Sequence, residues 1–341
     1  MKLELRSVRI KNCGPIDDIK IDFFDASGNT LPVCVIGGAN GSGKTTVLEV
    51  IAAMAQMLIP TPPMDILSKN QKSPKYLSEK KSDYLQMDWL IGGKELSLFY
   101  GVPPNDAILS EEKCGWGQGP YPNTLMPEDT GLAIEIRQKI GWQQGIPSKY
   151  PISLVDLLSN LVPSIIYLPH NRSLEPVSAD QLQKETDQYE FVRRIEAVRQ
   201  FPGSLTSYLI WLEYSDTERF LQMQTFLNNL DFGGKTFHIN RKALDVFVRT
   251  ESGHEHRFHE LSSGEQNLLI ILIELYRKLL PGSIVLIDEI ENSLHPTYQR
   301  RLAQGLLALQ KETPYQLIVT THAPAFVEIF GEENTRLLTP F

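Results

Sequence analysis

Apolar and polar residues alternate in two short runs near the start of the chain. Residues 3–11 (LELRSVRIK) and 16–24 (IDDIKIDFF) both repeat with a period of two, and a turn-forming stretch separates them. This alternation is typical of β-strands with one buried face. We therefore predict an antiparallel strand pair here, and a second hairpin where the runs 84–91 and 94–101 flank two glycines.

Elsewhere the pattern predicts buried strands and amphipathic helices in turn. Continuous apolar runs predict strands buried on both faces, and they lie at 33–36, 164–168, 283–287 and 315–320. Periodic apolar residues predict helices at 44–58, 152–161, 263–280 and 296–311, with a broken helical pattern from about 180 to 230. Alternation predicts further strands between 235 and 259, and a short helix and strand end the chain. Residues 59–83 are predicted to be a loop or insertion, and no element is assigned within 102–150.

The composition is that of an ordinary globular protein. The chain has 341 residues, of which 42% are hydrophobic and 22% are charged. Its apolar runs are shorter than the roughly 18 residues of a membrane span, and its first residues lack the apolar core of a signal peptide. Three cysteines, Cys13, Cys34 and Cys114, have neither metal-site nor disulfide spacing. We therefore expect a cytoplasmic protein without a membrane partner.

The net charge bears on nucleic-acid binding. A formal charge of −8 argues against non-specific binding to nucleic acid through bulk charge. Arg193, Arg194 and Arg199 nevertheless cluster on one predicted helix, and Arg300 and Arg301 lie on another. Each cluster is either part of a basic groove or a solvated helix face, and the second is the commoner outcome.

A glycine-rich turn is the strongest local signal. Residues 38–45 (GANGSGKT) match G-x-x-x-x-G-K-[ST] at every position, between a predicted strand and a predicted helix. Such a turn points backbone N–H groups at phosphate oxygens, and the dipole of the following helix adds positive potential. We expect Lys44 to contact the β- and γ-phosphates of ATP and Thr45 to bind Mg²⁺. The residues of this turn predicted to bind ATP are Gly38, Asn40, Gly41, Ser42, Gly43, Lys44, Thr45 and Thr46.

An acidic pair, Asp288-Glu289, ends the buried strand predicted near 284–287. Two carboxylates at such a place are costly unless they serve a cation or a reaction. In a chain with a phosphate-binding turn, we assign Asp288 to Mg²⁺ and Glu289 to the general base that polarises the attacking water.

Two further motifs each have a structural alternative. Ser262 followed by Glu265 fits an ordinary helix N-cap, and His322 at the end of a strand fits a structural histidine. Beside the other motifs, however, LSSGEQ (261–266) resembles the signature sequence of ATP-binding-cassette (ABC) ATPases, and His322 resembles their switch histidine. The segment 290–296 (IENSLHP) resembles their subunit-crossing loop.

Within this family the resemblance is to the ATPase heads of the SMC, RecF and OLD-nuclease grouping. The opening VRIKNCGPI (8–16), the LSSGE form of the signature and the long gap between Lys44 and Leu261 carry it. The resemblance implies an α/β P-loop NTPase fold with an ABC-ATPase-type mixed sheet, an antiparallel β subdomain and an inserted helical lid. The resemblance covers residues 1–58 and 261–341. The order of the predicted elements divides the chain into an ATPase lobe, 1–58 with 235–341, an insertion, 59–163, and a helical lid or arm, 164–234.

The resemblance also implies a mechanism and partners. Lys44, Glu289 and His322 are the expected catalytic residues, while the signature residues contact a γ-phosphate held by a second subunit; these are Ser262, Ser263 and Gly264. The chain would hydrolyse ATP as a head-to-tail dimer or larger oligomer. It would gate an effector protein encoded nearby, in DNA repair or in defence against phage, with DNA or RNA as a further candidate partner. The alternatives are a DNA-binding clamp that acts alone and the soluble cassette of a membrane transporter.

Some features of the family have no clear counterpart. The sequence has no coiled-coil arm and no zinc hook. The position of the family's lid glutamine is not fixed by the sequence: Asn171 and Arg172, after the run IIYLPHNR, stand near the expected place, and Arg172 resembles an arginine often seen in compact ATPases of this group. Further candidates are Gln181, Gln183 and Gln188. His254, His256 and His259 would allow a zinc site, but an exposed strand is the better interpretation because no fourth ligand lies nearby.

Overall fold

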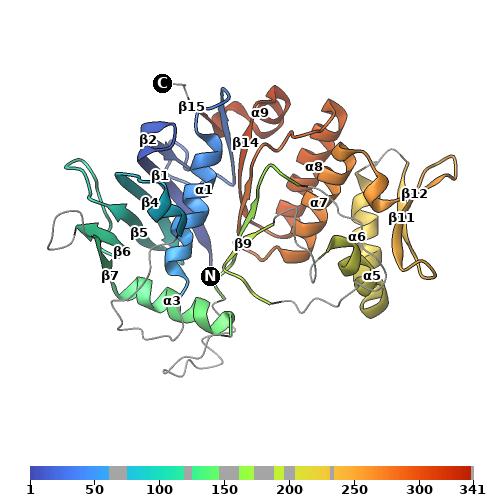
Figure 1. Cartoon of the computed structure of the whole chain (residues 1–341), viewed down its shortest axis with the longest axis horizontal. Helices are drawn as coiled ribbons and strands as arrows, with labels where there is room; N and C mark the ends of the chain where they lie inside the picture. The colour runs from blue at the N-terminus through green and yellow to red at the C-terminus, as the bar shows by residue number, and fades with distance from the viewer. Residues whose placement is uncertain are drawn as a thin grey trace.

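A parallel sheet lies at the centre of the computed structural model, which describes residues 1–60, 75–118, 125–145, 161–172, 188–195, 204–230 and 234–338 (Figure 1). Its six strands run in the order β15-β3-β14-β13-β8-β9. They are β3 (Val33–Gly38), β8 (Ile165–Leu168), β9 (Val192–Arg194), β13 (Ile284–Ile287), β14 (Gln316–Thr321) and β15 (Thr335–Leu338). The sheet therefore joins β3, which precedes the glycine-rich turn, to strands that are distant in sequence.

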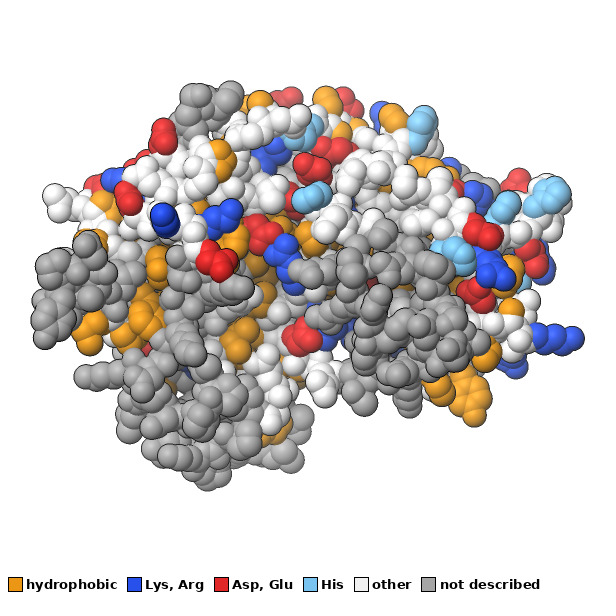
Figure 2. Space-filling model, in the orientation of Figure 1, with side chains coloured by type: hydrophobic (Ala, Val, Ile, Leu, Met, Phe, Trp, Pro, Cys, Tyr) orange, Lys and Arg blue, Asp and Glu red, His pale blue; other side chains and the backbone are white. Residues whose placement is uncertain are grey.

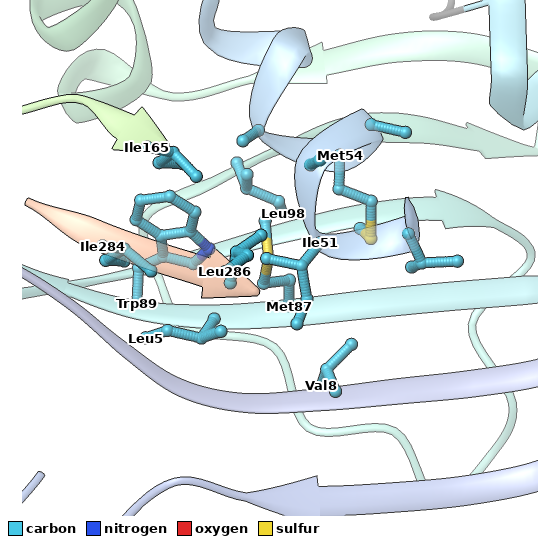
Figure 3. Packing of buried hydrophobic residues seen from close by; sticks show 14 of the residues in the cluster. Leu5, Val8, Ile51, Met54, Met87, Trp89, Leu98, Ile165, Ile284 and Leu286 are labelled. Carbon is cyan, nitrogen blue, oxygen red and sulfur yellow. The ribbon is translucent and has the colours of Figure 1, made fainter. Parts of the chain in front are cut away.

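The apolar strands of this sheet divide their side chains between two cores. In β13, Ile284 and Leu286 belong to one buried cluster, while Val285 and Ile287 belong to the other. Figure 3 shows Ile284 and Leu286 beside Trp89, in the layer that also holds Ile51. Because strand side chains alternate between faces, a continuous apolar run is what a strand covered on both sides requires.

A second sheet covers one side. Its strands, in the order β2-β1-β4-β5-β6-β7, are antiparallel apart from the parallel pair β5 and β6. They are β1 (Leu3–Cys13), β2 (Ile16–Asp22), β4 (Tyr84–Ile91), β5 (Lys94–Gly101), β6 (Lys113–Gln118) and β7 (Leu125–Asp129). Helix α1 (Lys44–Ala55) lies between the two sheets (Figure 1) and is followed by the 3-10 turn Gln56–Leu58.

Helices and a small sheet cover the other side. Helices α7 (Ser263–Lys278) and α8 (Pro296–Glu312) lie against the parallel sheet, and α5 and α6 lie beyond them with a three-stranded sheet (Figure 1). The remaining elements are α2 (Lys75–Glu79), α3 (Gly131–Gln143), α5 (Leu205–Ser215), α6 (Thr217–Asn229), β10 (Thr236–Asn240), β11 (Asp245–Arg249), β12 (Glu255–Arg257), α9 (Pro324–Phe330) and the 3-10 turns Phe258–Glu260 and Glu332–Asn334. Within the described ranges, no helix has the length and apolarity needed to cross a membrane.

Most of the predicted elements are confirmed. β1 pairs with β2 and β4 pairs with β5, both antiparallel as expected. The four continuous apolar runs are β3, β8, β13 and β14, and the helices predicted near 44, 263 and 296 are α1, α7 and α8. The predicted α/β class with mixed sheets is confirmed. The helix predicted at 152–161 lies outside the described residues.

The prediction that Arg193 and Arg194 lie on a helix is wrong, because both residues lie in strand β9. The N–H of Ile165 donates to the carbonyl oxygen of Phe191 (2.7 Å), and the N–H of Ile195 donates to that of Tyr167 (2.8 Å). Pairing with β8 therefore makes this segment a strand, although its local pattern of apolar residues favours a helix. The predicted arm, 164–234, contributes β8 and β9 to the parallel sheet as well as α5 and α6. Arg199 lies outside the described residues.

Candidate functional site

The glycine-rich turn lies between β3 and α1, as its sequence predicts. Gly43 has φ +91° and forms the N-cap of α1. A Cβ atom at this position would lie 2.5 Å from Cγ1 of Ile16 in β2. Both the left-handed backbone and the close approach of the second sheet therefore require glycine here. The turn directs the N-terminal end of α1 toward the carboxyl ends of the central strands.

Lys44 and Ser42 present polar atoms within this turn. The Lys44 side chain is largely buried, and its Nζ donates to the carbonyl oxygens of Gly38 (3.0 Å) and Ala39 (2.9 Å). Burial lowers the pKa of Lys44, against the opposing effect of the carboxylates of Glu289, Glu291 and Asp288. The buried hydroxyl of Ser42 has no hydrogen-bond partner among the described residues. A buried hydroxyl without a partner and an ammonium at the start of a helix fit an anionic ligand such as phosphate.

Asp288 joins the turn to the central strands. Its side chain is fully buried and accepts hydrogen bonds from Thr45 Oγ1 (2.9 Å to Oδ2, 3.1 Å to Oδ1) and Thr320 Oγ1 (2.7 Å). The Nδ1 atom of His170 lies 3.4 Å from Oδ2. The hydroxyl of Thr45 and the carboxylate of Asp288 are oxygen ligands of the kind that Mg²⁺ prefers, so the pair could hold this ion.

Glu289 follows in an unusual backbone conformation. Its φ is +45°, a left-handed value that costs roughly 1–2 kcal/mol for a residue with a Cβ. Its N–H donates to Oγ1 of Thr320 (2.7 Å), so this one hydroxyl bonds to both members of the acidic pair. Glu291 accepts a hydrogen bond at Oε1 from the backbone N–H of His322 (2.6 Å), and the His322 side chain is exposed. The ends of β13 and β14 are thus fixed to each other.

The residues that resemble an ABC signature lie at the start of helix α7. Ser262 is its N-cap: Oγ accepts from the N–H of Glu265, and the Glu265 carboxylate accepts from the N–H of Ser262. The helix-cap interpretation is therefore confirmed. Ser262 and Ser263 are both exposed. Gly264 is buried, and a Cβ there would lie 2.5 Å from the carbonyl oxygen of Ser293. That contact joins the start of α7 to the segment that follows the acidic pair.

The structure does not bring all of the predicted residues together. Lys44, Thr45 and Asp288 share one site, whereas the hydroxyl of Ser262 is hydrogen-bonded to Glu265 in the first turn of α7. Of the lid candidates, Asn171 is exposed and Arg172 is bonded to main-chain oxygens. Gln181 and Gln183 lie outside the described residues, and the carbonyl oxygen of Gln188 accepts from Arg193 (2.8 Å).

The other candidate clusters are separate from this site. His256 lies in the short strand β12, with His254 and His259 beside it. Within the described residues no group of three potential metal ligands is found. Arg301 of α8 has its guanidinium 5.5 Å from the ring centroid of Tyr298. On the face seen in Figure 2, described acidic and basic side chains are interspersed.

Sequence reasoning missed several residues of the site. Thr320 donates a hydrogen bond to the carboxylate of Asp288, and Nδ1 of His170 lies 3.4 Å from the same carboxylate. Asn267 donates to the carbonyl oxygen of Asn292, in the segment that follows the acidic pair. Thr320 could have been found, because it directly precedes Thr321-His322 at the end of the strand adjacent to the acidic pair. The contribution of Asn267 depends on contacts between distant segments, for which a single sequence carries no signal.

Comparison with known proteins gives the family. A family model described only as "AAA domain" matches residues 7–87. The Escherichia coli "Retron Ec83 probable ATPase" is 36% identical over 90 residues, which are 23% of this chain and 16% of that protein. An SMC head domain from Thermotoga maritima has 16% identity and a TM-score of 0.46, with 96% of this chain and 92% of that one covered. A bacterial ABC transporter cassette has 14% identity and a TM-score of 0.39, with 99% and 94% covered. The model described as "AAA domain, putative AbiEii toxin, Type IV TA system" matches residues 147–328, more than half of the chain, so the chain belongs to this AAA-domain family.

Proposed function

We propose that this AAA-domain protein binds Mg²⁺ and ATP and hydrolyses ATP to ADP and phosphate. One contact carries the proposal. The hydroxyl of Thr45, the first threonine after the lysine of the phosphate turn, lies 2.9 Å from Oδ2 of Asp288 across 243 positions of sequence. Two motifs that predict the same chemistry independently are thus adjacent in space, as a shared Mg²⁺ site requires.

The roles of the other residues follow from where they lie. Lys44 and the amides of the turn would hold the phosphates, and Ser42 would supply a further hydroxyl. Glu289 would act as the general base toward water, because it adjoins Asp288 at the carboxyl end of the central sheet. His322 ends the neighbouring strand and would contact the γ-phosphate. Mg²⁺, when bound, would neutralise charge on the phosphates and help to orient them.

We further propose that two copies enclose two ATP molecules in a head-to-tail dimer. The exposed Ser262 and Ser263, on the capped and fixed start of α7, support this arrangement because they are free to face another molecule. Gly264 would lie with them at the γ-phosphate held by the partner copy. This is the arrangement implied by the sequence resemblance to ABC-type heads of the SMC, RecF and OLD-nuclease grouping.

The biological role that we propose is gating of an effector protein encoded nearby. The relation to a retron protein favours defence against phage over DNA repair, although the matched segment spans only 16% of that protein. A DNA- or RNA-binding clamp is the second candidate. The interspersed charges on the face in Figure 2 and the net charge of −8 argue against it. A transporter cassette is the third.

The variant Glu289→Gln tests catalysis and assembly together. It should retain ATP and accumulate as a dimer or larger assembly, because the γ-phosphate contacts persist when hydrolysis is slowed by about 100-fold or more. Size-exclusion chromatography with light scattering and bound-nucleotide analysis would measure this. Adding Lys44→Ala should return the protein to the monomer. Glu312→Gln, an exposed change on α8, is the control and should behave as wild type.

Each part of the proposal can fail separately. A Glu289→Gln protein that holds ATP but stays monomeric would contradict the dimer and leave nucleotide binding intact. A wild-type protein that binds no ATP in the presence of Mg²⁺ would contradict the nucleotide site itself.

A further inference from the structure

The guanidinium of Arg172 lies behind the acidic pair. It donates from Nη1 to the carbonyl oxygen of Asp288 (2.9 Å) and from Nη2 to that of Glu289 (3.0 Å). Nη1 also lies within hydrogen-bond distance of the carbonyl oxygens of Leu168 (3.2 Å), the last residue of β8, and Pro169 (2.7 Å), the first residue of the loop that carries the arginine. A single side chain therefore ties the end of β8 to the end of β13.

These bonds are made to main-chain atoms, not to the carboxylates. Asp288 thereby keeps its side-chain oxygens for Thr45 and Thr320. Burial lowers the pKa of Arg172 to about 10, against the opposing effect of nearby carboxylates, so the guanidinium stays protonated at neutral pH. A lysine could not reproduce the arrangement, since only the planar fork of arginine presents several N–H donors at fixed angles.

The same arginine contacts the signature helix. Its Nε donates to Oδ1 of Asn267 in α7 (2.6 Å), and Nδ2 of Asn267 donates to the carbonyl oxygen of Asn292 (2.5 Å). Nδ2 of Asn292 donates in turn to the carbonyl oxygen of His170 (2.7 Å). These bonds close a ring that joins the loop after β8, the segment after β13 and the first turns of α7.

The backbone of Glu289 needs such support. Its left-handed φ of +45° is unfavourable for a residue with a Cβ, and such conformations persist only where surrounding contacts hold them. Arg172 bonds to the carbonyl oxygen of this residue, while Thr320 bonds to its N–H. The peptide groups on both sides of the Glu289 side chain are thus fixed.

We propose that Arg172 is a positioning residue that sets the orientation of Glu289 and makes it depend on the position of helix α7. The inference rests on the proposed ATPase function and deepens it. Arg172 acts through the backbone and does not contact the nucleotide. A shift of α7, which begins with the exposed serines Ser262 and Ser263, is passed through Asn267 and Arg172 to the general base.

Steady-state turnover and equilibrium nucleotide binding of the full chain test this role. Arg172→Lys keeps the charge but loses the fork, and we expect kcat to fall by about 10- to 100-fold, the size of effect that a misplaced catalytic group produces. The Kd for Mg²⁺ and a non-hydrolysable ATP analogue should change by less than about threefold, because Arg172 holds no phosphate. Asn267→Ala should likewise lower kcat and leave the Kd nearly unchanged, with a smaller loss of kcat than in Arg172→Lys. The double variant should lose no more than Arg172→Lys alone, since the two residues act in one chain of contacts.

Arg336→Lys is the matched control. Arg336 likewise donates to main-chain carbonyl oxygens, those of Asp22, Phe24, Glu333 and Thr335, but these lie away from the acidic pair. We expect Arg336→Lys and Arg172→Lys both to lower the melting temperature, because each loses bonds to main-chain oxygens. Arg336→Lys should nevertheless leave kcat within about twofold of wild type, because it shares only the structural part of the effect.

The outcomes separate the inference from the function beneath it. Wild-type protein without ATP turnover would overturn the proposed function and the inference together. Active wild-type protein with an unchanged kcat in Arg172→Lys and Asn267→Ala would overturn the inference alone. Loss of kcat in Arg336→Lys equal to that in Arg172→Lys would do the same, because it would reduce the effect to general stability. If Arg172→Lys does not fold, Asn267→Ala decides the question by the same comparison.

Discussion

Asp88 in the antiparallel part of the second sheet and Asp288 in the parallel sheet have similar surroundings. Asp88 accepts hydrogen bonds from Ser7 (2.5 Å) and Ser97 (2.7 Å), and from the amide of Gln86 (2.9 and 3.1 Å). Asp288 accepts from two threonine hydroxyls and lies beside a histidine. In both cases hydroxyl groups surround an acidic side chain on or directly after a strand.

The origin of the donors distinguishes the two aspartates. The donors to Asp88 lie on β1, β4 and β5, and Gln86 is itself bonded to Tyr84 and to the carbonyl oxygen of Ile108. A polar network closed in this way stabilises and orients the sheet. The donors to Asp288 come from the phosphate turn and from the end of β14, at the carboxyl edge of a parallel sheet, where ligands bind in open α/β folds. Location and the origin of the donors therefore distinguish the candidate site from the polar cluster around Asp88.

Replacing each aspartate with asparagine should give the largest difference in ATP turnover between the two clusters. Asp288→Asn should lower ATP turnover by about 100-fold or more, because an amide is a poor Mg²⁺ ligand. Asp88→Asn should leave turnover near the wild-type value and lower the free energy of unfolding by about 1–3 kcal/mol, since the new amide would face existing donors. Turnover assays and urea unfolding of the two variants measure this. A comparable loss of turnover in both would remove the distinction between the two clusters.

A pair of hydroxyl deletions sharpens the same comparison. Thr320 and Ser97 are both fully buried, and each donates to an aspartate and accepts from a backbone N–H, that of Glu289 or Ser110. Thr320→Val and Ser97→Ala should each cost about 1–3 kcal/mol of unfolding free energy, because each removes a buried hydroxyl that bonds both to a carboxylate and to a backbone N–H. Only Thr320→Val should also lower kcat, by about 10-fold, since it releases the backbone of Glu289, the proposed general base. Equal kcat values in the two variants, at equal stability, would contradict the role given to Thr320.

The sequence predicts those parts of the fold and site that depend on neighbouring residues. Alternation predicts β1 and β2, continuous apolar runs predict β3 and β13, and local spacing predicts the phosphate turn. The site residues Thr45 and Asp288 follow from motif chemistry, although the contact between them had to be inferred from two separate motifs. In each case the physical cause lies within a window of about ten residues.

Contacts between distant segments decide the parts that could not be predicted. Arg172 and Asn267 are 95 positions apart, and the bond between them leaves no trace in local composition. The strand at Arg193 and Arg194 exists because β8 offers an edge to pair with. Helix α3 and strands β6 and β7 lie in a stretch rich in Pro and Gly, in which tertiary pairing outweighs weak local preference.

Replacing Glu265 gives the smallest expected effect, a change in how the free energy of unfolding depends on pH. Burial raises the pKa of this carboxyl, but hydrogen bonds from Lys235 and Ser262 outweigh it and hold the pKa below the ordinary value of 4.5. Its contribution to stability is therefore present above pH 4.5 and is lost as the pH falls through the folded-state pKa. At pH 7 Glu265→Gln should lower the free energy of unfolding by about 1 kcal/mol, and chemical denaturation at pH 7 and at successively lower pH should show this difference shrinking. Glu260→Gln, which removes the negative charge from the exposed acceptor of the Arg257 N–H, is the control for loss of charge at a helix start alone. A difference between wild type and Glu265→Gln that grows on acidification would contradict the assigned ion pair, and with it the fixed start of α7.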